Sequence, residues 1–166
     1  NDNTSNPLVT SYLYDKADRV REITYPKQYP SNTRKVAKYN YDAASRYNEM
    51  LFGGQSFASA VSYNAESQAT TLKVGYNTGA NEIKELYTYN SQNGLLTNQK
   101  VQKNPSSPTN LLNLSYDYAK VGGGTGVTGQ LTKITNDLDQ TKNRFYEYDA
   151  LARLRKAKGG QTGTDW

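Results

Sequence analysis

The sequence predicts an all-β protein in which antiparallel β-hairpins follow one another in a curved open sheet or a solenoid-like array. Three observations lead to this prediction. Tyrosines recur in pairs separated by one residue, and an aspartate or asparagine often follows the pair. No stretch of 11–18 residues has the apolar period of a helix. Because residues i and i+2 of a strand point to the same face, each pair places two rings side by side on one face of the sheet.

The tyrosine pairs divide the chain into repeated units. Ten of the 15 tyrosines belong to pairs, which are Tyr12/Tyr14, Tyr39/Tyr41, Tyr87/Tyr89, Tyr116/Tyr118 and Tyr146/Tyr148. Two weaker copies keep a single tyrosine before an asparagine, at Tyr63 and Tyr76. Units therefore begin near residues 12, 39, 61, 74, 87, 116 and 146. This recurrence predicts one continuous array over residues 1–166, and we expect it to be a fragment of a longer repeat protein.

The residues after each pair predict how the hairpin turns. In three units an arginine stands four residues after an aspartate, as the pairs Asp15/Arg19, Asp42/Arg46 and Asp149/Arg153, and Asn90 replaces the aspartate in a fourth unit. Aspartate and asparagine bond to the backbone two residues on and initiate turns. The arginine at the exit is expected to form a charge-assisted bond with the carboxylate and so fix the hairpin. The segments 26–32 and 104–110, which contain proline, are predicted as loops between hairpins.

Composition excludes several classes of functional site. The chain has 166 residues with no cysteine and no histidine, so zinc fingers, iron–sulfur centres, cysteine nucleophiles and Ser-His-Asp triads are ruled out. No apolar run approaches the ~20 residues of a transmembrane segment. The net charge is +5, but 15 acidic residues are mixed among the 20 basic ones. We therefore expect solvated basic clusters, no specific nucleic-acid partner and no cofactor.

The repeated motif resembles that of a known family. Residues 146–154 read Tyr-Glu-Tyr-Asp-Ala-Leu-Ala-Arg-Leu, and residues 12–20 are a close copy. This pattern resembles the repeat of the Rhs/YD-repeat proteins, which include bacterial Rhs and wall-associated proteins, the YD shells of insecticidal toxin complexes, and the teneurins. The family usually has glycine directly before the arginine. Asp18, Ser45 and Ala152 occupy that position here, which is expected to weaken the turn slightly.

The resemblance implies a non-enzymatic structural segment of a secreted or cell-surface β-shell. Such a shell encloses a toxin domain or displays a surface that binds partners. Implied partners are further YD repeats of the same chain, an enclosed toxin domain or a glycan. The exposed edges of such a sheet also predict self-assembly through edge strands. The aspartate-containing core motif that ends the shell in many Rhs proteins is not found in this sequence.

Other functions remain open beside this expectation. The tyrosine pairs are expected to form a buried or shell-lining face, but exposed rings with asparagine and glutamine would instead bind carbohydrate or protein. The Asp–Arg pairs are expected to be structural, with a repeated anion or sugar contact as the alternative. A glycosidase would need two suitably spaced carboxylates, for which Asp137/Asp139 and Glu82/Glu85 are the candidates. The first pair is predicted to share one face of a strand.

Overall fold

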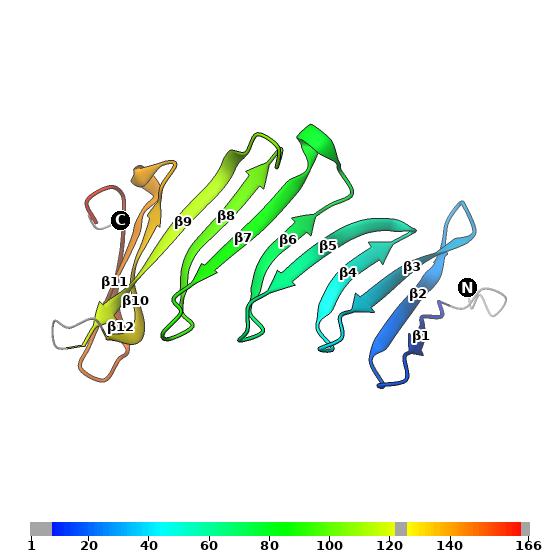
Figure 1. Ribbon diagram of the computed structural model, residues 1–166, viewed down its shortest axis with the longest axis horizontal. Coiled ribbons are helices and arrows are strands. Elements are labelled where there is room, and N and C mark those ends of the chain that lie inside the picture. Colours follow the sequence, from blue (N-terminus) through cyan, green and yellow to red (C-terminus); the bar gives the residue numbers. More distant parts are fainter. Residues whose placement is uncertain (1–7, 122–125, 164–166) are drawn as a thin grey trace, which may run out of the picture. The chain divides into compact units, whose positions relative to one another are not determined.

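The computed structural model describes residues 8–121 and 126–163. The chain divides into two compact units, unit 1 (Asn1–Thr78) and unit 2 (Gly79–Trp166). Each unit is an open antiparallel sheet whose strands lie side by side in chain order, as Figure 1 shows.

Every strand pairs with its predecessor within its unit, so each unit is a series of hairpins. The strands of unit 1 are β1 (Ser11–Tyr14), β2 (Val20–Gln28), β3 (Thr33–Tyr41), β4 (Tyr47–Phe52), β5 (Gln55–Tyr63) and β6 (Ala69–Val74). Those of unit 2 are β7 (Ile83–Tyr89), β8 (Leu96–Lys103), β9 (Thr109–Lys120), β10 (Val127–Asn136), β11 (Arg144–Tyr148) and β12 (Leu154–Gly159). Two short 3-10 turns, η1 (Gly79–Asn81) and η2 (Gln140–Lys142), are the only helical elements of the described residues. No helix among residues 8–121 and 126–163 has the length and apolarity needed to cross a membrane.

The predicted all-β fold of serial hairpins in an open sheet is confirmed. Two details differ from the prediction. The unit expected near residue 74 is not a hairpin of its own, because Tyr76 lies in the connection after β6 and the next strand begins only at Ile83. The loop predicted at 26–32 is shorter, because β2 continues through Pro26. A shift of register between Thr24 and Lys27 accommodates the proline, which cannot donate a ladder hydrogen bond.

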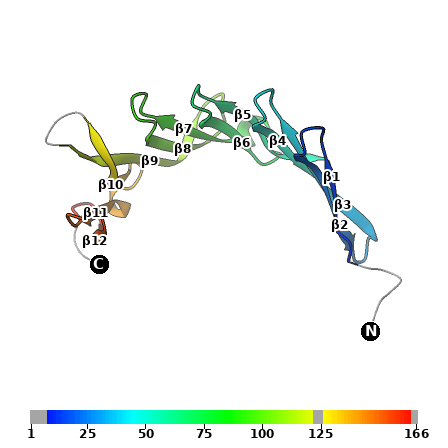
Figure 2. The ribbon, with the colours of Figure 1, turned by 90° about the horizontal axis from the view of Figure 1, so that it is seen from below.

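Neither unit has a packed two-layer core. Figure 2 shows each unit as a single layer of strands. Among the described hydrophobic residues, Ala37 is the buried one, with 2 % of its surface exposed. Most domains bury an apolar sheet face against a second layer of structure. Here the sheet is held by contacts between neighbouring strands, and one apolar face stays uncovered.

The predicted turns share one backbone geometry. In the first of them, the Asp15 N–H donates to the Arg19 carbonyl at 2.9 Å and the Asp18 N–H donates to the Asp15 carbonyl at 3.2 Å. Asp18 then has a positive φ of 57°, as does Ser45 at 64° in the second turn and Ala152 at 62° in the last. This is a three-residue hairpin loop with a bulge. The position before the arginine therefore requires the left-handed conformation that favours glycine.

Candidate functional site

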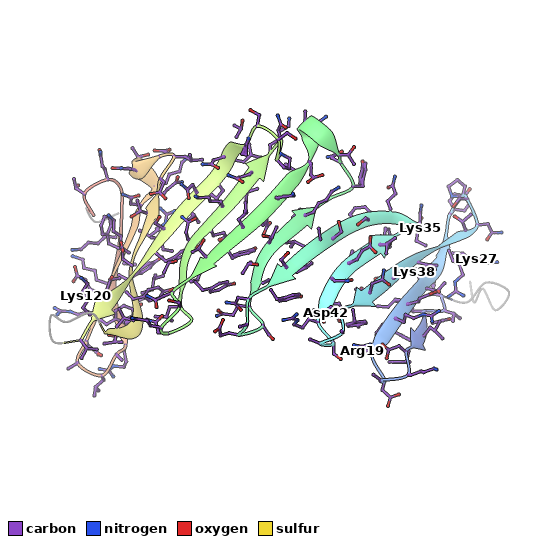
Figure 3. All side chains as sticks on the ribbon, viewed as in Figure 1. Arg19, Lys27, Lys35, Lys38, Asp42 and Lys120 are labelled. Atoms are coloured by element: carbon purple, nitrogen blue, oxygen red, sulfur yellow. The ribbon has the colours of Figure 1, made fainter. Side chains whose placement is uncertain are left out.

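The aspartate and arginine of each predicted pair form a bonded unit, here called the turn clasp. In the second hairpin, Asp42 Oδ1 accepts the backbone N–H groups of Ala44 and Arg46, both at 2.9 Å. Asp42 Oδ2 accepts the Arg46 guanidinium through Nε at 2.8 Å and through Nη2 at 2.8 Å. One carboxylate therefore holds both the backbone of the turn and the side chain at its exit. Figure 3 labels Arg19 and Asp42, which lie at the same edge of unit 1.

The same clasp recurs in the first and last hairpins, between Asp15 and Arg19 and between Asp149 and Arg153. The charge-assisted bond expected from the sequence is thus present in all three. A neutral version that the sequence analysis missed joins Asn64 to Gln68, whose side-chain amides bond at 2.8 Å. Asn64 and Gln68 have the same four-residue spacing in the sequence as the Asp–Arg pairs, and that spacing could have identified them. Asn90 begins a turn that is one residue longer, since its N–H donates to the Leu95 carbonyl, and no side chain among the described residues closes that turn in the same way.

The clasp changes the ionisation of its aspartates. The side-chain bond from Arg19 is the largest cause that holds the pKa of Asp15 below its ordinary value of 3.8. For Asp42 and Asp149 the hydrogen bond from the backbone N–H of the arginine is the largest cause of the lowered pKa. The arginine side chain lowers the pKa further in both, although burial of Asp42 has a larger effect in the opposite direction. A carboxyl whose pKa is lower in the folded than in the unfolded state stabilises the fold when it is ionised.

We therefore expect acid to weaken the hairpins. The contribution of the clasps is fully present above the ordinary aspartate pKa and is lost as the pH falls through the lowered values. Urea midpoints measured between about pH 6 and pH 2 should decrease toward acid. The matched control is Asp42→Asn with Arg46→Gln, which copies the neutral clasp and should flatten this dependence. An unchanged acid dependence in that variant would contradict the assignment.

Each clasp arginine of unit 1 also contacts the next hairpin. The Arg19 guanidinium lies over the Tyr41 ring, 4.2 Å from its centroid, and Arg46 lies 4.3 Å from the centroid of Tyr63. The hydroxyl of the same tyrosine donates to the carbonyl of the residue directly after the arginine. Tyr41 donates to Val20 at 2.8 Å, and Tyr63 donates to Tyr47 at 2.5 Å. This arrangement, here called the junction, joins one hairpin to the next through a cation–π contact and a hydrogen bond.

Tyr39, Tyr47 and Tyr63 lie with apolar neighbours on one face of unit 1. Tyr39 pairs with Met50, and Met50 pairs with Ala58, so these side chains share that face. They line a hollow of about 370 Å³ together with Tyr47, Glu49, Val61, Tyr63, Ala69 and Leu72. The predicted tyrosine face is therefore present. Tyr39, Tyr41 and Tyr63 are half-buried on this face, whereas Tyr47 is 54 % exposed, as Tyr12 and Tyr14 of β1 are at 56 % and 53 %.

A second row of aromatic rings was missed by the sequence analysis. Tyr25, Phe52, Phe57 and Tyr76 contact one another in that order, with ring centroids 5.8, 6.1 and 5.8 Å apart. The three contacts are edge-to-face, an arrangement that aromatic pairs favour. The four residues come from different parts of unit 1 and follow no common motif. Only the pairing of the strands brings them together.

In unit 2 the tyrosine face carries hydrogen-bonded polar groups as well. The Tyr87 hydroxyl donates to the Glu85 carboxylate, and the Tyr116 hydroxyl donates to Gln99 Oε1 at 3.0 Å. Tyr118 repeats the bond of the junction, since its hydroxyl donates to the Leu96 carbonyl at 2.9 Å. Tyr89, Tyr146 and Tyr148 are half-buried on their strands. The hydroxyl bonds of Tyr87, Tyr116 and Tyr118 therefore fix the orientation of these three rings within the sheet.

Burial raises the pKa of several of these phenols. Desolvation is the largest cause for Tyr41 and for Tyr87, and each has a pKa of about 12. A raised pKa means that the neutral phenol stabilises the folded state. That contribution is present below the ordinary value of 10.0 and is lost as the pH rises through about 12.

We expect the tyrosines to ionise in at least two phases on alkaline titration. The late phase, near pH 12, should come from Tyr41 and Tyr87 and should shrink in the Tyr41→Phe and Tyr87→Phe variants. Ultraviolet absorbance of tyrosinate measures this directly. If the Tyr41→Phe and Tyr87→Phe variants both retained the late phase in full, the assignment would be wrong.

The carboxylates considered for catalysis do not form a pair on one strand face. Strand β10 ends at Asn136, whose Oδ1 accepts the N–H groups of Leu138 and Asp139 and so turns the chain. Asp139 then caps η2 and pairs with Lys142, while Asp137 accepts a bond from Ser115. Glu82 pairs with Lys84, and Glu85 accepts the Tyr87 hydroxyl. Within residues 8–121 and 126–163, no group of three acidic residues could hold a metal ion.

Comparison with known proteins identifies the fold. No family model matches the chain, and no curated protein matches it. Solved structures do match, at 21–22 % sequence identity over 90 % of this chain. They include the crystal structure of TcdB2-TccC3-Cdc42, with a TM-score of 0.70, and that of TcdB2-TccC3, with a TM-score of 0.68. The Tc holotoxin pore of Photorhabdus luminescens, with a substituted TccC3, also matches, with a TM-score of 0.68.

The chain has the fold of these toxin-complex chains. The resemblance to YD-repeat shells noted in the sequence is confirmed at the level of fold. The chain spans 7 % of the length of the solved chains it matches.

Proposed function

We propose that this chain is a non-enzymatic structural segment of a secreted or cell-surface β-shell that encloses a toxin. The observation that carries the proposal is the fold match to TcdB2-TccC3 chains over 90 % of the residues. The single-layer architecture supports it, because a sheet with one uncovered apolar face and no packed core suits a wall. In this role the clasps and junctions set the spacing of the hairpins, and the tyrosine face lines the enclosed space.

The test uses the native polypeptide purified from its source. We expect a chain much longer than 166 residues that forms a hollow particle by electron microscopy. Limited proteolysis should leave an internal segment protected until the particle is opened by denaturant. A native polypeptide of about this length, without a hollow particle or a protected segment, would overturn the proposal.

A second candidate function is a surface module that binds carbohydrate or protein. It is favoured by the hollow of about 370 Å³ between Tyr39, Tyr47 and Tyr63, where rings are available for stacking on a sugar face. Titration of the 166-residue chain with a panel of glycans, followed by tyrosine fluorescence, distinguishes the two. A saturable response that Tyr47→Ala removes would support binding. A flat response across the panel would leave the wall segment as the sole proposal.

A further inference from the structure

Tyr41 and Tyr47 form the closest ring pair among the described residues of unit 1. Their ring centroids lie 4.7 Å apart, against 5.8–6.1 Å for the other ring contacts of this unit, and the ring planes are inclined by 32°. The two residues lie opposite each other on β3 and β4. Directly opposed side chains of an antiparallel pair are close neighbours on one face of the sheet. The contact is therefore built into the second hairpin.

Hydrogen bonds hold the oxygen-bearing ends of the two rings together. The Tyr41 hydroxyl donates to the Val20 carbonyl at 2.8 Å, which fixes the position of its oxygen. Desolvation is the largest cause of the raised pKa of Tyr41, and a side-chain hydrogen bond with Tyr47 is the next. This second bond keeps the two phenol oxygens, and with them the carbons ortho to the oxygens, beside each other. The ortho carbons carry much of the unpaired spin of an oxidised phenol, so the geometry favours coupling of the two rings.

Solvent reaches the pair through Tyr47. This residue is 54 % exposed, whereas Tyr41 is half-buried. Strand β4 pairs with both β3 and β5, so Tyr47 is exposed on the face of the sheet and not at its edge. A small oxidant therefore has access to one ring of the pair.

Tyr39 also contacts Tyr47, but in a less favourable geometry. Its ring centroid is 5.8 Å from that of Tyr47, and the planes meet at 61°. In such an edge-to-face contact the edge of one ring points at the face of the other. Of the two tyrosines beside Tyr47, Tyr41 is therefore the expected coupling partner.

We propose that Tyr41 and Tyr47 are a site of oxidative cross-linking, at which a haem peroxidase with hydrogen peroxide joins the two rings as dityrosine. Each phenol loses one electron and one proton to become a phenoxyl radical. The radicals form a carbon–carbon bond between their ortho carbons, and the two ortho hydrogens then move to the phenol oxygens as protons. The chain loses two hydrogen atoms in all, and one hydrogen peroxide is reduced to two water molecules.

The exposed ring is the place where oxidation begins. Tyr47 is oxidised first, and its radical takes an electron and a proton from Tyr41 across the contact. A second oxidation of Tyr47 then places a radical on each ring. The proposal does not rest on the shell function, because it uses only contacts within unit 1.

The test treats the 166-residue chain with a haem peroxidase and hydrogen peroxide at low protein concentration, where coupling between chains is rare. We expect the fluorescence of dityrosine in the monomer and a mass lower by two hydrogen atoms. Trypsin cleaves after Arg46, between the two tyrosines, so the cross-link should join the peptides 39–46 and 47–73. Fragmentation of the joined peptides should locate the bond between Tyr41 and Tyr47.

Phenylalanine variants distinguish this pair from its neighbours. Tyr41→Phe and Tyr47→Phe keep a ring but cannot form a phenoxyl radical there, so each should lower the yield of the joined peptides at least ~10-fold, since coupling depends on proximity. Tyr39→Phe is the matched control, because Tyr39 contacts Tyr47 as well, and it should retain the yield. Circular dichroism checks that every variant is folded.

Three outcomes would overturn the proposal. They are a monomer that loses no hydrogen atoms, a bond that lies between other tyrosines, and a yield that Tyr41→Phe leaves unchanged. A yield lost in Tyr39→Phe but kept in Tyr41→Phe would assign the bond to Tyr39 and so contradict the proposal as well. None of these outcomes bears on whether the native polypeptide forms a hollow particle, so the two proposals fail separately.

Discussion

Replacing Tyr41 by alanine is expected to destabilise unit 1 by about 2–3 kcal/mol, somewhat less than removal of a fully buried ring. The variant loses the contact with the Tyr47 ring at 4.7 Å, the cation–π contact with Arg19 and the hydrogen bond to the Val20 carbonyl. The contacts with Arg19 and Val20 join β3 to the hairpin before it in addition to the β2–β3 ladder, and the ring contact with Tyr47 joins β3 to β4. Urea unfolding followed by circular dichroism measures the change.

Two further variants separate the ring from its hydroxyl. Tyr41→Phe keeps the ring and loses only the hydrogen bond, so it should cost about 1 kcal/mol. Tyr12→Ala removes a ring that is 56 % exposed, and its effect should stay within about 0.5 kcal/mol. If Tyr41→Ala and Tyr12→Ala were equally destabilising, the junction would contribute nothing to the sheet.

Placing glycine directly before the clasp arginine is expected to stabilise the chain. Asp18, Ser45 and Ala152 have positive φ angles of 57°, 64° and 62°, where a side chain costs roughly 1 kcal/mol or more. The triple variant Asp18→Gly, Ser45→Gly, Ala152→Gly should therefore gain about 2–3 kcal/mol, since distant sites add. Asp18 should contribute least, because aspartate tolerates this conformation better than serine or alanine.

A control lies in the same turn. Ala150 is exposed and is not among the residues with positive φ, so Ala150→Gly only increases the freedom of the unfolded chain. It should destabilise by about 0.5–1 kcal/mol. Thermal and urea unfolding of Ala152→Gly and Ala150→Gly should therefore shift in opposite directions. Shifts in the same direction would show that the left-handed position costs nothing here.

Much of the fold could be predicted because its determinants are local. The strand alternation around each tyrosine pair, the turn after Asp15 and the bond to Arg19 all involve residues within a few positions of one another. The neutral clasp between Asn64 and Gln68 has the same spacing and could have been found as well. Near residue 74 the structure has Tyr76 in the connection after β6, because a single tyrosine before an asparagine is too short a signal to distinguish a strand from a connection.

The contacts between hairpins could not be predicted in this way. Arg19 lies over Tyr41, 22 positions away, and Arg46 lies over Tyr63, 17 positions away, so no fixed spacing marks the contact. The aromatic row from Tyr25 to Tyr76 has no motif at all. Both depend on which strands are neighbours and in which register they pair, which is a property of the whole sheet.

The sequence by itself determined that the chain is all-β, that its hairpins repeat and that their turns are closed by Asp–Arg bonds, because periodicity and turn chemistry act over two to five residues. Only the tertiary structure decided that each clasp arginine of unit 1 also contacts the next hairpin, whereas the Arg153 side chain is 73 % exposed and has no described ring beneath it. The physical reason is that strand order and register determine which side chains are neighbours across a sheet. Because the loops between strands differ in length, these neighbours have no fixed spacing in the sequence.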